Sequence, residues 1–563
     1  METVKTKGKV VFVNPSLRYG DEPQAALVYP FPGLMILASI LDAVDYEVKV
    51  VDANIFTEAE FERRLFAELN DDVLYVGFNL MTMNVAWAYG YMLKIKAKFP
   101  LLRIIVGGFH PTLFPQQMIN DENVDIVVVN EAVHTIELLT DTIRTGGDLS
   151  KVPGIMFKDG GQIIKNTPNT KGDSFENLPF INFELFEHEL YATNNAVIYP
   201  YFPKPRTEYR AYPIQTSFGC PYRCTFCINA IFSRRYKIRS AEEIVARIEY
   251  LMERYNANFF ILYDEEFCID KKRLYKFVEL VEEKKLKFQW RTSLRVSNFR
   301  ENYLNDEWVK RLENIGFVCS VMGGESGSQR ILDEIKKQIT LQEMVNAFEA
   351  LSKTTIVPKI SFMAGLPGES DAEVLASYRF AIKLKQMMLK KNLKTDIGMF
   401  PFRLYPGSPL YDKAVKELGV KEETRTLKEF AAVNGKEMAE GMGYEAVYNK
   451  YLKDPVRFEK MLFLYDTFIW PHWGNGTLFR NILSWTTMKR FEYGFFNFTF
   501  IERFILKSAK TLRSWLRAIR LLKNPYVDRA KLAQKVKGNP SALNLRRDLM
   551  GVAAESTMQN TEA

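Results

Sequence analysis

The sequence predicts an α/β protein in which a doubly wound parallel sheet is followed by a partial barrel and then by a helical region. Short runs rich in Val and Ile alternate with helical periods twice, over the first 145 residues and again over residues 214–402. Apolar strands joined by helices are typical of parallel sheets that are covered on both faces. A chain of 563 residues is also too long for one hydrophobic core, so several domains are expected.

The N-terminal sheet is predicted to be flavodoxin-like. Its strands are expected at residues 10–13, 48–51, 73–78, 104–106 and 124–129, and its helices at residues 34–44, 58–69, 85–98 and 135–145. Ligands of such sheets bind at the carboxyl ends of the strands. The candidate loops at those ends carry Asn14, Thr82, Glu131 and the run 107–112. No GxGxxG run follows the first strand, which argues against a dinucleotide site.

The second alternation predicts a TIM-like partial (β/α)6 barrel. Its strands are expected at residues 214–217, 259–263, 288–291, 318–322, 359–363 and 396–400, and its helices at residues 241–254, 271–283, 306–315, 341–351 and 371–389. In barrels the chemistry lies at the carboxyl ends of the strands. The unusual residues fall there: three cysteines, the acidic run 264–266, Arg291, Arg295 and the glycine runs 323–324 and 365–368.

These patterns divide the chain into five segments. Residues 1–150 are the first domain, and residues 151–210 are a connector that holds a hairpin with a glycine turn. Residues 211–412 are the barrel, residues 413–525 a helical region rich in aromatic and basic residues, and residues 526–563 a tail expected to be disordered.

The positive charge is confined to the C-terminus. Lys and Arg number 76 against 68 Asp and Glu, but residues 480–563 hold 16 basic and 6 acidic residues, so the rest of the chain is nearly neutral. A general nucleic-acid binder is therefore excluded. In residues 505–520, apolar and basic residues occupy opposite faces of a helix. This helix either packs on the barrel or makes peripheral contact with an anionic membrane surface.

A reducing, cytoplasmic location is expected. The start of the chain lacks the apolar segment of a signal peptide, and no run of 18 apolar residues occurs. The 5 cysteines are an odd number, and three of them lie within eight residues, which does not fit a secreted disulfide framework.

Cys220, Cys224 and Cys227 form a C-x3-C-x2-C cluster after the first barrel strand. A zinc site takes four ligands, and no nearby Cys or His supplies the fourth. A 4Fe-4S cluster is usually held by four thiolates, so three would leave one iron open to a substrate. A degenerate zinc site and a chance grouping of cysteines are the alternatives.

This spacing, with the aromatic Phe226 inside it, resembles the radical SAM (S-adenosylmethionine) superfamily. Gly323, Gly324 and Glu325 look like that family's glycine-acid motif, which implies that Glu325 holds the SAM amino group. Gly365 begins a run similar to the family's fifth-strand motif near adenine, and residues 405–411 are similar to a run that follows the barrel. Arg291 or Arg295 is expected to hold the SAM carboxylate or ribose.

The N-terminal domain resembles the cobalamin-binding module that precedes the barrel in one large branch of the superfamily. The residues that the resemblance assigns to cobalamin are Asn14, Thr82, Gly107, Gly108, His110, Pro111, Thr112 and Glu131. No Asp-x-His-x-x-Gly run occurs, so no histidine of that motif ligates cobalt. Asn130 and Glu131 also stand where many relatives carry Gly-Glu-Gly-Glu.

The resemblance implies an enzyme with a 4Fe-4S cluster, SAM and cobalamin. Its leading function is a C-methyltransferase acting on an apolar or large biosynthetic substrate. The expected partners are a small-molecule or lipid-like substrate and an electron donor such as flavodoxin or ferredoxin. The alternatives are a radical cyclase or oxidative enzyme of tetrapyrrole or isoprenoid-lipid metabolism, similar to the anaerobic magnesium-protoporphyrin ester cyclases, and a non-catalytic cobalamin or iron–sulfur sensor. No catalytic residue beyond the cofactor ligands is assigned, and His472 and the aromatic stretch around it have no assigned role.

Overall fold

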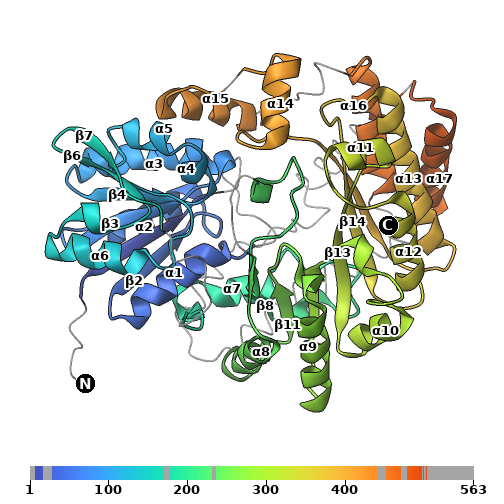
Figure 1. The fold of residues 1–563 in the computed structure, drawn as a ribbon, viewed down its shortest axis with the longest axis horizontal. Helices are drawn as coiled ribbons and strands as arrows, with labels where there is room; N and C mark the ends of the chain where they lie inside the picture. Colours follow the sequence, from blue (N-terminus) through green and yellow to red (C-terminus); the bar gives the residue numbers. More distant parts are fainter. Residues whose placement is uncertain are drawn as a thin grey trace, which may run out of the picture.

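The computed structural model describes residues 7–16, 28–169, 178–230, 236–421, 423–439, 452–470, 478–497, 499 and 502–503. Two sheets of mainly parallel strands stand side by side in these residues, and helices of the C-terminal region lie along their upper edge (Figure 1). The α/β fold class predicted from the sequence is confirmed.

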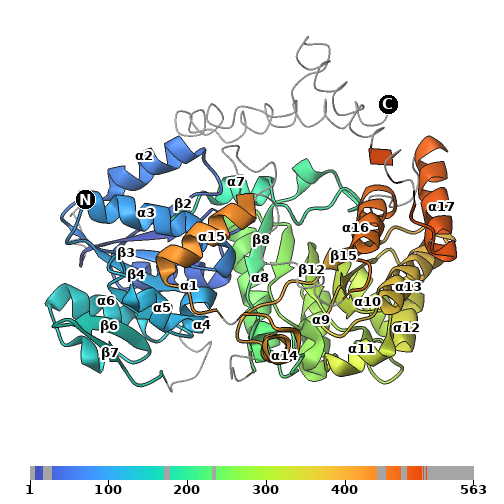
Figure 2. The same ribbon diagram turned by 90° about the horizontal axis from the view of Figure 1, so that it is seen from above.

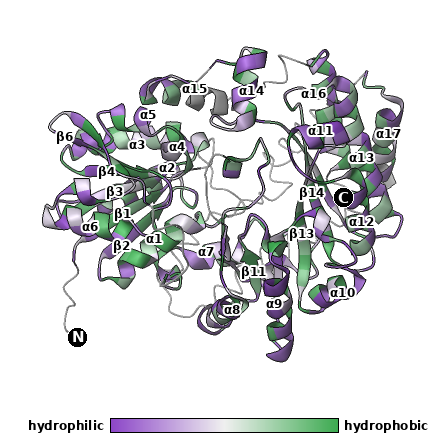
Figure 3. Cartoon of the chain, viewed as in Figure 1, coloured by the Kyte–Doolittle hydropathy of each residue, from purple (hydrophilic) through white to green (hydrophobic). Residues whose placement is uncertain are grey.

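The first sheet has seven strands in the order β2-β1-β3-β4-β5-β6-β7. The five parallel strands are β1 (Lys9–Asn14), β2 (Glu47–Asp52), β3 (Val73–Asn79), β4 (Arg103–Gly107) and β5 (Ile126–Val128). Their order, 2-1-3-4-5, is that of flavodoxin-like sheets. The covering helices are α1 (Pro32–Ala43), α2 (Glu58–Glu68), α3 (Val85–Lys98), α4 (Phe109–Leu113), α5 (Pro115–Asn120) and α6 (Ile136–Thr145). Figure 3 shows the central strands as hydrophobic, as expected for a sheet buried on both faces.

The hairpin predicted in the connector extends this sheet. Its strands are β6 (Ile155–Asp159) and β7 (Gln162–Lys165), and β6 pairs antiparallel with β5. Gly160 and Gly161 form the turn with φ of 54° and 81°. An apolar run alone does not reveal the partner of a strand, so the sequence located the hairpin without showing that it belongs to the first sheet.

The second sheet has six parallel strands in the order β15-β14-β13-β12-β11-β8. They are β8 (Ala211–Ile214), β11 (Phe259–Leu262), β12 (Gln289–Ser293), β13 (Phe317–Glu325), β14 (Val357–Ala364) and β15 (Asp396–Pro401). The helices between them are α8 (Ala241–Tyr255), α9 (Lys271–Glu283), α10 (Asp306–Asn314), α11 (Gln329–Glu334), α12 (Leu341–Leu351) and α13 (Asp371–Leu389). No pairing joins β8 to β15 among the described strands, so the barrel is open.

The first barrel strand ends earlier than predicted. The sequence placed it at residues 214–217, but β8 ends at Ile214 because the backbone N–H of Thr216 is taken by Asp264, at 2.9 Å, instead of by a strand. The chain then forms a separate antiparallel pair, β9 (Ser217–Phe218) with β10 (Lys237–Ile238).

A buried polar network joins the two parts. Asp52, at the end of β2, accepts hydrogen bonds from Asn14, at 2.9 Å, and from Tyr191 on α7 (His188–Thr193), which leads into the barrel. Tyr191 also stacks on Tyr29, with the ring centroids 4.7 Å apart. The connector is therefore packed into the first domain.

The C-terminal helices pack back onto both sheets. They are α14 (Pro409–Leu418), α15 (Leu427–Ala439), α16 (Pro455–Leu464) and α17 (Leu478–Tyr493). Figure 2 shows α15 beside α3 of the first domain, whereas α16 and α17 lie against the barrel. Part of the aromatic stretch is buried core, since Tyr465 and Phe491 pack on Tyr378 of α13.

Several predictions for the C-terminus fall outside the described residues. These are the basic helix at residues 505–520, the tail at residues 526–563 and His472. Within the described part, every helix is too short or too polar to cross a bilayer.

A glycine at the start of β13 tests the packing of the barrel. A Cβ at Gly316, where φ is +86°, would lie 2.0 Å from the carbonyl oxygen of Phe288. Gly316→Ala is expected to lower the free energy of unfolding by at least about 2 kcal/mol. Gly90→Ala is the matched control, because nothing lies within 4 Å of a Cβ there and alanine favours the helix by up to about 1 kcal/mol. Denaturant unfolding of both variants measures the difference, and equal stabilities would contradict the packing.

Candidate functional site

The three clustered cysteines lie on one loop at the carboxyl edge of the barrel. The loop starts after β9 and returns at β10, and the pairing of these two strands closes its base. Cys220, Cys224 and Cys227 are all free thiols, and Cys224 is buried. The loop thus presents three sulfur atoms from a short, anchored segment.

Burial dominates the electrostatics of these thiols. It raises the pKa of Cys220 and raises that of Cys227 to about 11, and the nearby Glu265 adds to both shifts. Backbone N–H groups of Tyr222 and Asn229 donate to the two sulfur atoms and act in the opposite direction. A bound metal would deprotonate such thiols outright.

The donor set fits an iron–sulfur cluster with one open iron. Among the described side chains, no three His, Cys, Asp or Glu groups converge closely enough to form a finished metal site. The cysteine loop nevertheless offers three mutually interacting thiols and N–H donors to sulfur, which is what a cluster bound through three thiolates requires.

Two flanking segments brace the cysteine loop. The N–H of Thr225 donates to the carbonyl of Ile335, at 3.0 Å, and its carbonyl accepts from the N–H of Leu410, at 3.0 Å. The ring of Phe226 packs against an apolar cluster that includes Ile331 and Leu410. The run at residues 405–411 therefore leads into the helix that supports this loop, a role that the sequence alone did not reveal.

Glu325 forms a buried ion pair beside the cysteine loop. It ends β13 with φ of +63°, and its Oε1 lies 2.7 Å from Nζ of Lys337. The same Nζ lies 6.0 Å from the ring centroid of Phe226. A Cβ at Gly323 would lie 2.1 Å from Oε1 of Glu325, so the glycine makes room for the carboxylate. Lys337 was missed by the sequence analysis because its role depends on a turn that folds it back onto Glu325.

Gly324 serves the packing beneath this ion pair. A Cβ there would lie 2.8 Å from Cδ1 of Ile360 and 3.0 Å from Cζ of Phe362. Gly323 thus leaves room for the carboxylate of Glu325, whereas Gly324 allows the run to pack closely against β14.

The structure separates the two arginines that were predicted to share a role. Arg295 is buried, lies 3.7 Å from the ring centroid of Tyr222 and donates to the carbonyl of Lys337. It therefore joins the cysteine loop to the segment that carries Lys337. Arg291 lies lower on β12, opposite Cys319 of β13, and donates to the hydroxyl of Tyr199 at 3.1 Å.

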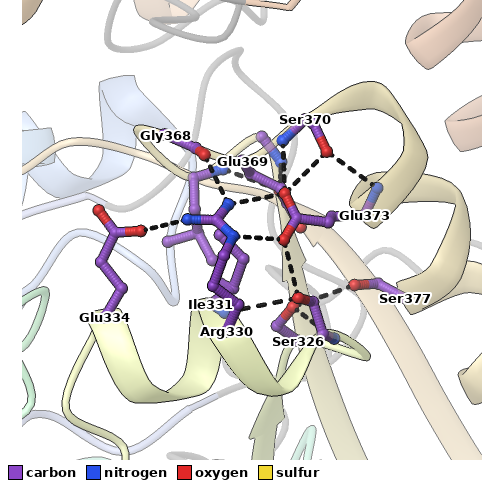
Figure 4. Close-up of polar contacts among 12 residues, drawn as sticks. Ser326, Arg330, Ile331, Glu334, Gly368, Glu369, Ser370, Glu373 and Ser377 are labelled. Carbon is purple, nitrogen blue, oxygen red and sulfur yellow. Dashed lines mark hydrogen bonds and ion pairs between the residues drawn. The ribbon is translucent and has the colours of Figure 1, made fainter.

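The fourth and fifth strand loops are clamped together (Figure 4). Arg330 of α11 donates to the carbonyl of Gly368, at 2.8 Å, and to Glu373, at 2.7 Å. Glu369 closes the turn, with its Oε2 accepting from the N–H of Gly365, at 2.7 Å. Gly365 has φ of +83°, so the turn favours glycine at the position that the resemblance assigns to SAM.

The two carboxylates of this clamp have opposite pKa shifts. Burial raises the pKa of Glu369 to about 8, and its Oε1 has no hydrogen-bond partner. Arg330 lowers the pKa of Glu373 to about 2. Glu369 is therefore protonated at neutral pH, whereas Glu373 is charged.

The acidic run after β11 is mostly structural. Asp264 pairs with Arg273, at 3.4 Å, and Glu266 accepts from Asn298, at 2.9 Å. Burial raises the pKa of Glu266 to about 7. Glu265 alone is exposed, and its charge acts on Cys220 and Cys227.

The candidate cobalamin loops meet at the carboxyl edge of the first sheet. A Cβ at Gly108, where φ is +103°, would lie 2.7 Å from the carbonyl oxygen of Leu80. Thr112 donates to the carbonyl of Gly108, at 2.8 Å, and accepts from the N–H of Asn130, at 3.0 Å. Loops that follow β3, β4 and β5 are thus joined around a backbone that a side chain would obstruct.

The remaining residues assigned to cobalamin lie around the same edge. Asn14 is buried and bound to Asp52, Thr82 and Pro111 are buried, and Gly107 and Glu131 are partly exposed. They remain predicted contacts.

His110 is buried and packs against α15. Its ring centroid lies 4.9 Å from that of Phe430, and its Nε2 is 2.9 Å from Oε1 of Gln117. Burial lowers the pKa of His110 to about 4, so the ring is neutral. Its contact with a corrin remains a prediction.

Comparison with known proteins identifies both parts of the site. Residues 214–381 match the model of the radical SAM superfamily, and residues 24–140 match that of the B12 binding domain. The chain thus carries a radical SAM domain and a B12-binding domain. The matched radical SAM residues include the three cysteines, Glu325 and Gly365. The radical SAM domain implies a 4Fe-4S cluster and SAM, and the B12-binding domain adds cobalamin.

The proteins similar to this chain have low sequence identity to it. The uncharacterized methyltransferase PH0819 of Pyrococcus horikoshii is 25% identical over 412 residues, which cover 72% of this chain and 83% of the relative. An anaerobic magnesium-protoporphyrin IX monomethyl ester cyclase of Rubrivivax gelatinosus is 27% identical over 386 residues, which cover 66% and 65%. The structure of the radical SAM methyltransferase TsrM from Kitasatospora setae, with cobalamin and a 4Fe-4S cluster bound, matches with a TM-score of 0.55 and 17% identity, covering 74% of this radical SAM chain and 76% of TsrM.

The clamp between the fourth and fifth strand loops predicts a pH effect on stability. Because the pKa of Glu369 is raised on folding, the native state holds a proton that the unfolded chain loses above about pH 4.5, so stability falls as pH rises toward 8. Glu369→Gln keeps the acceptor but removes this titration. The Tm of the variant minus that of the wild type is therefore expected to increase from pH 5.5 to pH 8. The corresponding difference in the free energy of unfolding changes by at most about 1.4 kcal/mol per pH unit.

Glu373→Gln is the control for this measurement. Its carboxylate has a lowered pKa, so the stability it contributes is complete above about pH 4.5 and is lost only as pH falls toward 2. The variant should thus be less stable by a constant amount between pH 5.5 and pH 8. A constant Tm difference for Glu369→Gln as well would contradict the buried, protonated carboxyl.

Proposed function

We propose that this chain is a cobalamin-dependent radical SAM enzyme that methylates a carbon atom of an apolar or large biosynthetic substrate. One observation supports this best: the segment from α14 to α15 contacts both halves of the site. Leu410 supports the cysteine loop, while the carbonyl of Arg425 accepts from Gln117, at 2.8 Å, and Phe430 packs on His110 in the B12-binding domain. The two cofactor edges are therefore held by one short stretch of chain.

The bound groups would supply radical chemistry from the cluster and SAM, and a methyl group from cobalamin. The residues of the chain bind and orient them. Cys220, Cys224 and Cys227 would hold the cluster, and Glu325 would accept a charge-assisted hydrogen bond from the SAM ammonium. Arg295 would bind the SAM carboxylate, and its hydrogen bond to the carbonyl of Lys337, the partner of Glu325, supports this role.

The other functions are less well supported. Relatives named as magnesium-protoporphyrin cyclases keep cyclisation as the alternative, but PH0819 and TsrM are named methyltransferases. A non-catalytic sensor would have no need for the Glu325–Lys337 pair beside three cluster cysteines. An electron donor such as flavodoxin or ferredoxin, a cytoplasmic location and a membrane contact through residues 505–520 belong to this proposal.

Replacing the cluster cysteines tests the first half of the proposal. After anaerobic reconstitution, the wild type is expected to bind about four irons and to form 5′-deoxyadenosine from SAM. Replacement of Cys220, Cys224 and Cys227 together by Ala should abolish both. Cys268→Ala is the control, since that buried cysteine lies outside the loop and its loss should leave the iron content unchanged. Iron retained in the triple variant would overturn the assignment.

Two glycine variants test the second half of the proposal, which is cobalamin binding. Gly108→Ala should displace the loop at Leu80 and abolish the corrin absorbance of the reconstituted protein, with its iron content kept. Gly160→Ala is the control, because it also has a positive φ but nothing lies within 4 Å of a Cβ. Formation of S-adenosylhomocysteine alongside 5′-deoxyadenosine would indicate methyl transfer. A wild type without corrin affinity would exclude the methyltransferase and leave the radical SAM assignment intact.

A further inference from the structure

Alternate side chains along the strands of the open barrel are partly exposed above its floor. Along β14, the residues that face the helices are buried, whereas Lys359, Ser361 and Met363 are partly exposed. The same alternation appears on β12 at Arg291 and Ser293, and on β13 beyond Cys319. Since neighbouring strands of a parallel sheet point equivalent residues to one face, these side chains line one common interior.

The floor of this interior is built by the connector. Ile198, Tyr201 and Phe202 pack against inward-facing residues of the barrel strands, including Phe259 and Cys319. Tyr199 stacks on Tyr201, with ring centroids 5.1 Å apart, and faces upward into the partly exposed layer. The barrel is thus closed from below by aromatic side chains.

Two cationic side chains lie on this floor, and only one of them is paired with a carboxylate. Nζ of Lys359 is 4.6 Å from the ring centroid of Tyr199, and the guanidinium of Arg291 is 5.8 Å from it. Lys359 forms an ion pair with Asp396. Among the described residues, no carboxylate pairs with Arg291, whose polar contact is the hydroxyl of Tyr199 and whose buried Nε has no partner.

Asp396 cannot serve as the missing counter-ion. Besides Lys359, it accepts hydrogen bonds from Tyr201, at 2.9 Å, and from the indole N–H of Trp470, at 2.7 Å. Its single charge is therefore balanced by Lys359. The nearby Cys319 does not help, because burial raises the pKa of its thiol to about 11 and keeps it neutral. The floor carries one positive charge in excess.

SAM cannot neutralise Arg291 if Glu325 holds its ammonium. The amino and carboxylate groups of SAM are attached to the same carbon, so the carboxylate must lie within a few ångströms of Glu325. Arg291 is paired with Cys319, which lies six residues below Glu325 on β13, or about 20 Å along the strand at a rise of about 3.3 Å per residue. Arg295 lies four residues after Arg291, toward the carboxyl edge, and is the arginine placed for that carboxylate.

We propose that Arg291, with Lys359 and Tyr199, forms a subsite at the barrel floor that binds an anionic group of the substrate, a carboxylate or a phosphate-like group. Withdrawing part of a guanidinium from water without a counter-ion is unfavourable, and the fold keeps this partly buried one at the closed end of the barrel, below side chains that are partly exposed. A planar guanidinium suits carboxylate and phosphate oxygens equally well. This inference rests on the proposed function, because it assigns the substrate of that same site.

The walls above the floor indicate the rest of the substrate. Val321 and Met363, farther along β13 and β14, are partly exposed, as is Trp470, and Phe400 of β15 is 42% exposed. Phe400 and Trp470 pack edge to face, with centroids 5.3 Å apart. The substrate would therefore be an elongated molecule with an apolar or aromatic body and one anionic end, with its reacting carbon toward the cofactors.

Charge-matched probes test this subsite on the reconstituted holoenzyme with SAM bound. The probes are 4-phenylbutyrate, 3-phenylpropylphosphonate and the neutral 4-phenylbutanamide, and binding is read from the rise in Tm with probe concentration in phosphate-free buffer. At least one anion is expected to bind, and the amide is not. Arg291→Met should weaken anion binding about ten- to a hundredfold, whereas Arg291→Lys should retain most of it. Which anion binds more tightly distinguishes a carboxylate from a phosphate-like group.

The controls separate this role from three others. Arg103→Gln removes an exposed arginine of the first domain and should change nothing. Without probe, Arg291→Met should be as stable as the wild type or more stable, because a partly buried charge that has no carboxylate partner is lost; a lower Tm would indicate a structural role and overturn the subsite. Weaker SAM binding by Arg291→Met would assign the arginine to SAM, and unchanged anion binding would also overturn the proposal.

Failure of the proposed function would look different. It would appear as missing corrin absorbance or missing S-adenosylhomocysteine, while the response of the anionic probes to Arg291→Met would persist. Failure of the subsite would instead leave cofactor binding and SAM cleavage intact.

Discussion

The buried ion pair between Glu325 and Lys337 constrains the whole cofactor edge of the barrel. Two charges inside a protein are tolerated only if their geometry is fixed and their remaining contacts are satisfied. The backbone is bent to achieve this, with a register shift on β13 between Gly323 and Glu325 and a left-handed conformation at Glu325. Phe226 lies on one side of Lys337, and Arg295 binds its carbonyl. The cysteine loop is thereby held against the glycine-acid run, and the carboxylate keeps one oxygen for a ligand.

Helices and loops from distant parts of the chain maintain this arrangement. Arg330 links the fourth strand loop to the fifth, and Leu410 supports the cysteine loop from the first helix after the barrel. The chain then crosses to the B12-binding domain, where Arg425 and Phe430 contact the helices around His110. The residues that follow the radical SAM match therefore contact both halves of the candidate site.

The strands and helices were largely predictable because their apolar periods are local. Helices α9, α12 and α13 have the predicted bounds, and the five parallel strands of the first sheet lie where expected. Features that depend on contacts between distant residues were not predictable. Arg291 and Arg295 look equivalent in the sequence, but the rise along β12 places one at the floor and the other at the mouth. Lys337 carries no motif, and the return of α15 over His110 left no trace in the spacing of residues.

An open six-stranded barrel has two exposed edges, and in this protein each is covered by a segment of the same chain. At β15, Tyr465 donates to the carbonyl of Ile397, at 3.0 Å, and Trp470 donates to Asp396, while the buried Lys385 binds the carbonyl of Ile469. At β8, α7 and the connector pack alongside. Edges covered in this way cannot pair with other strands, and the connector also closes the floor. A substrate of the proposed subsite would therefore enter from the carboxyl edge, where the cysteine loop and Glu325 lie, and its far end would reach Arg291 last.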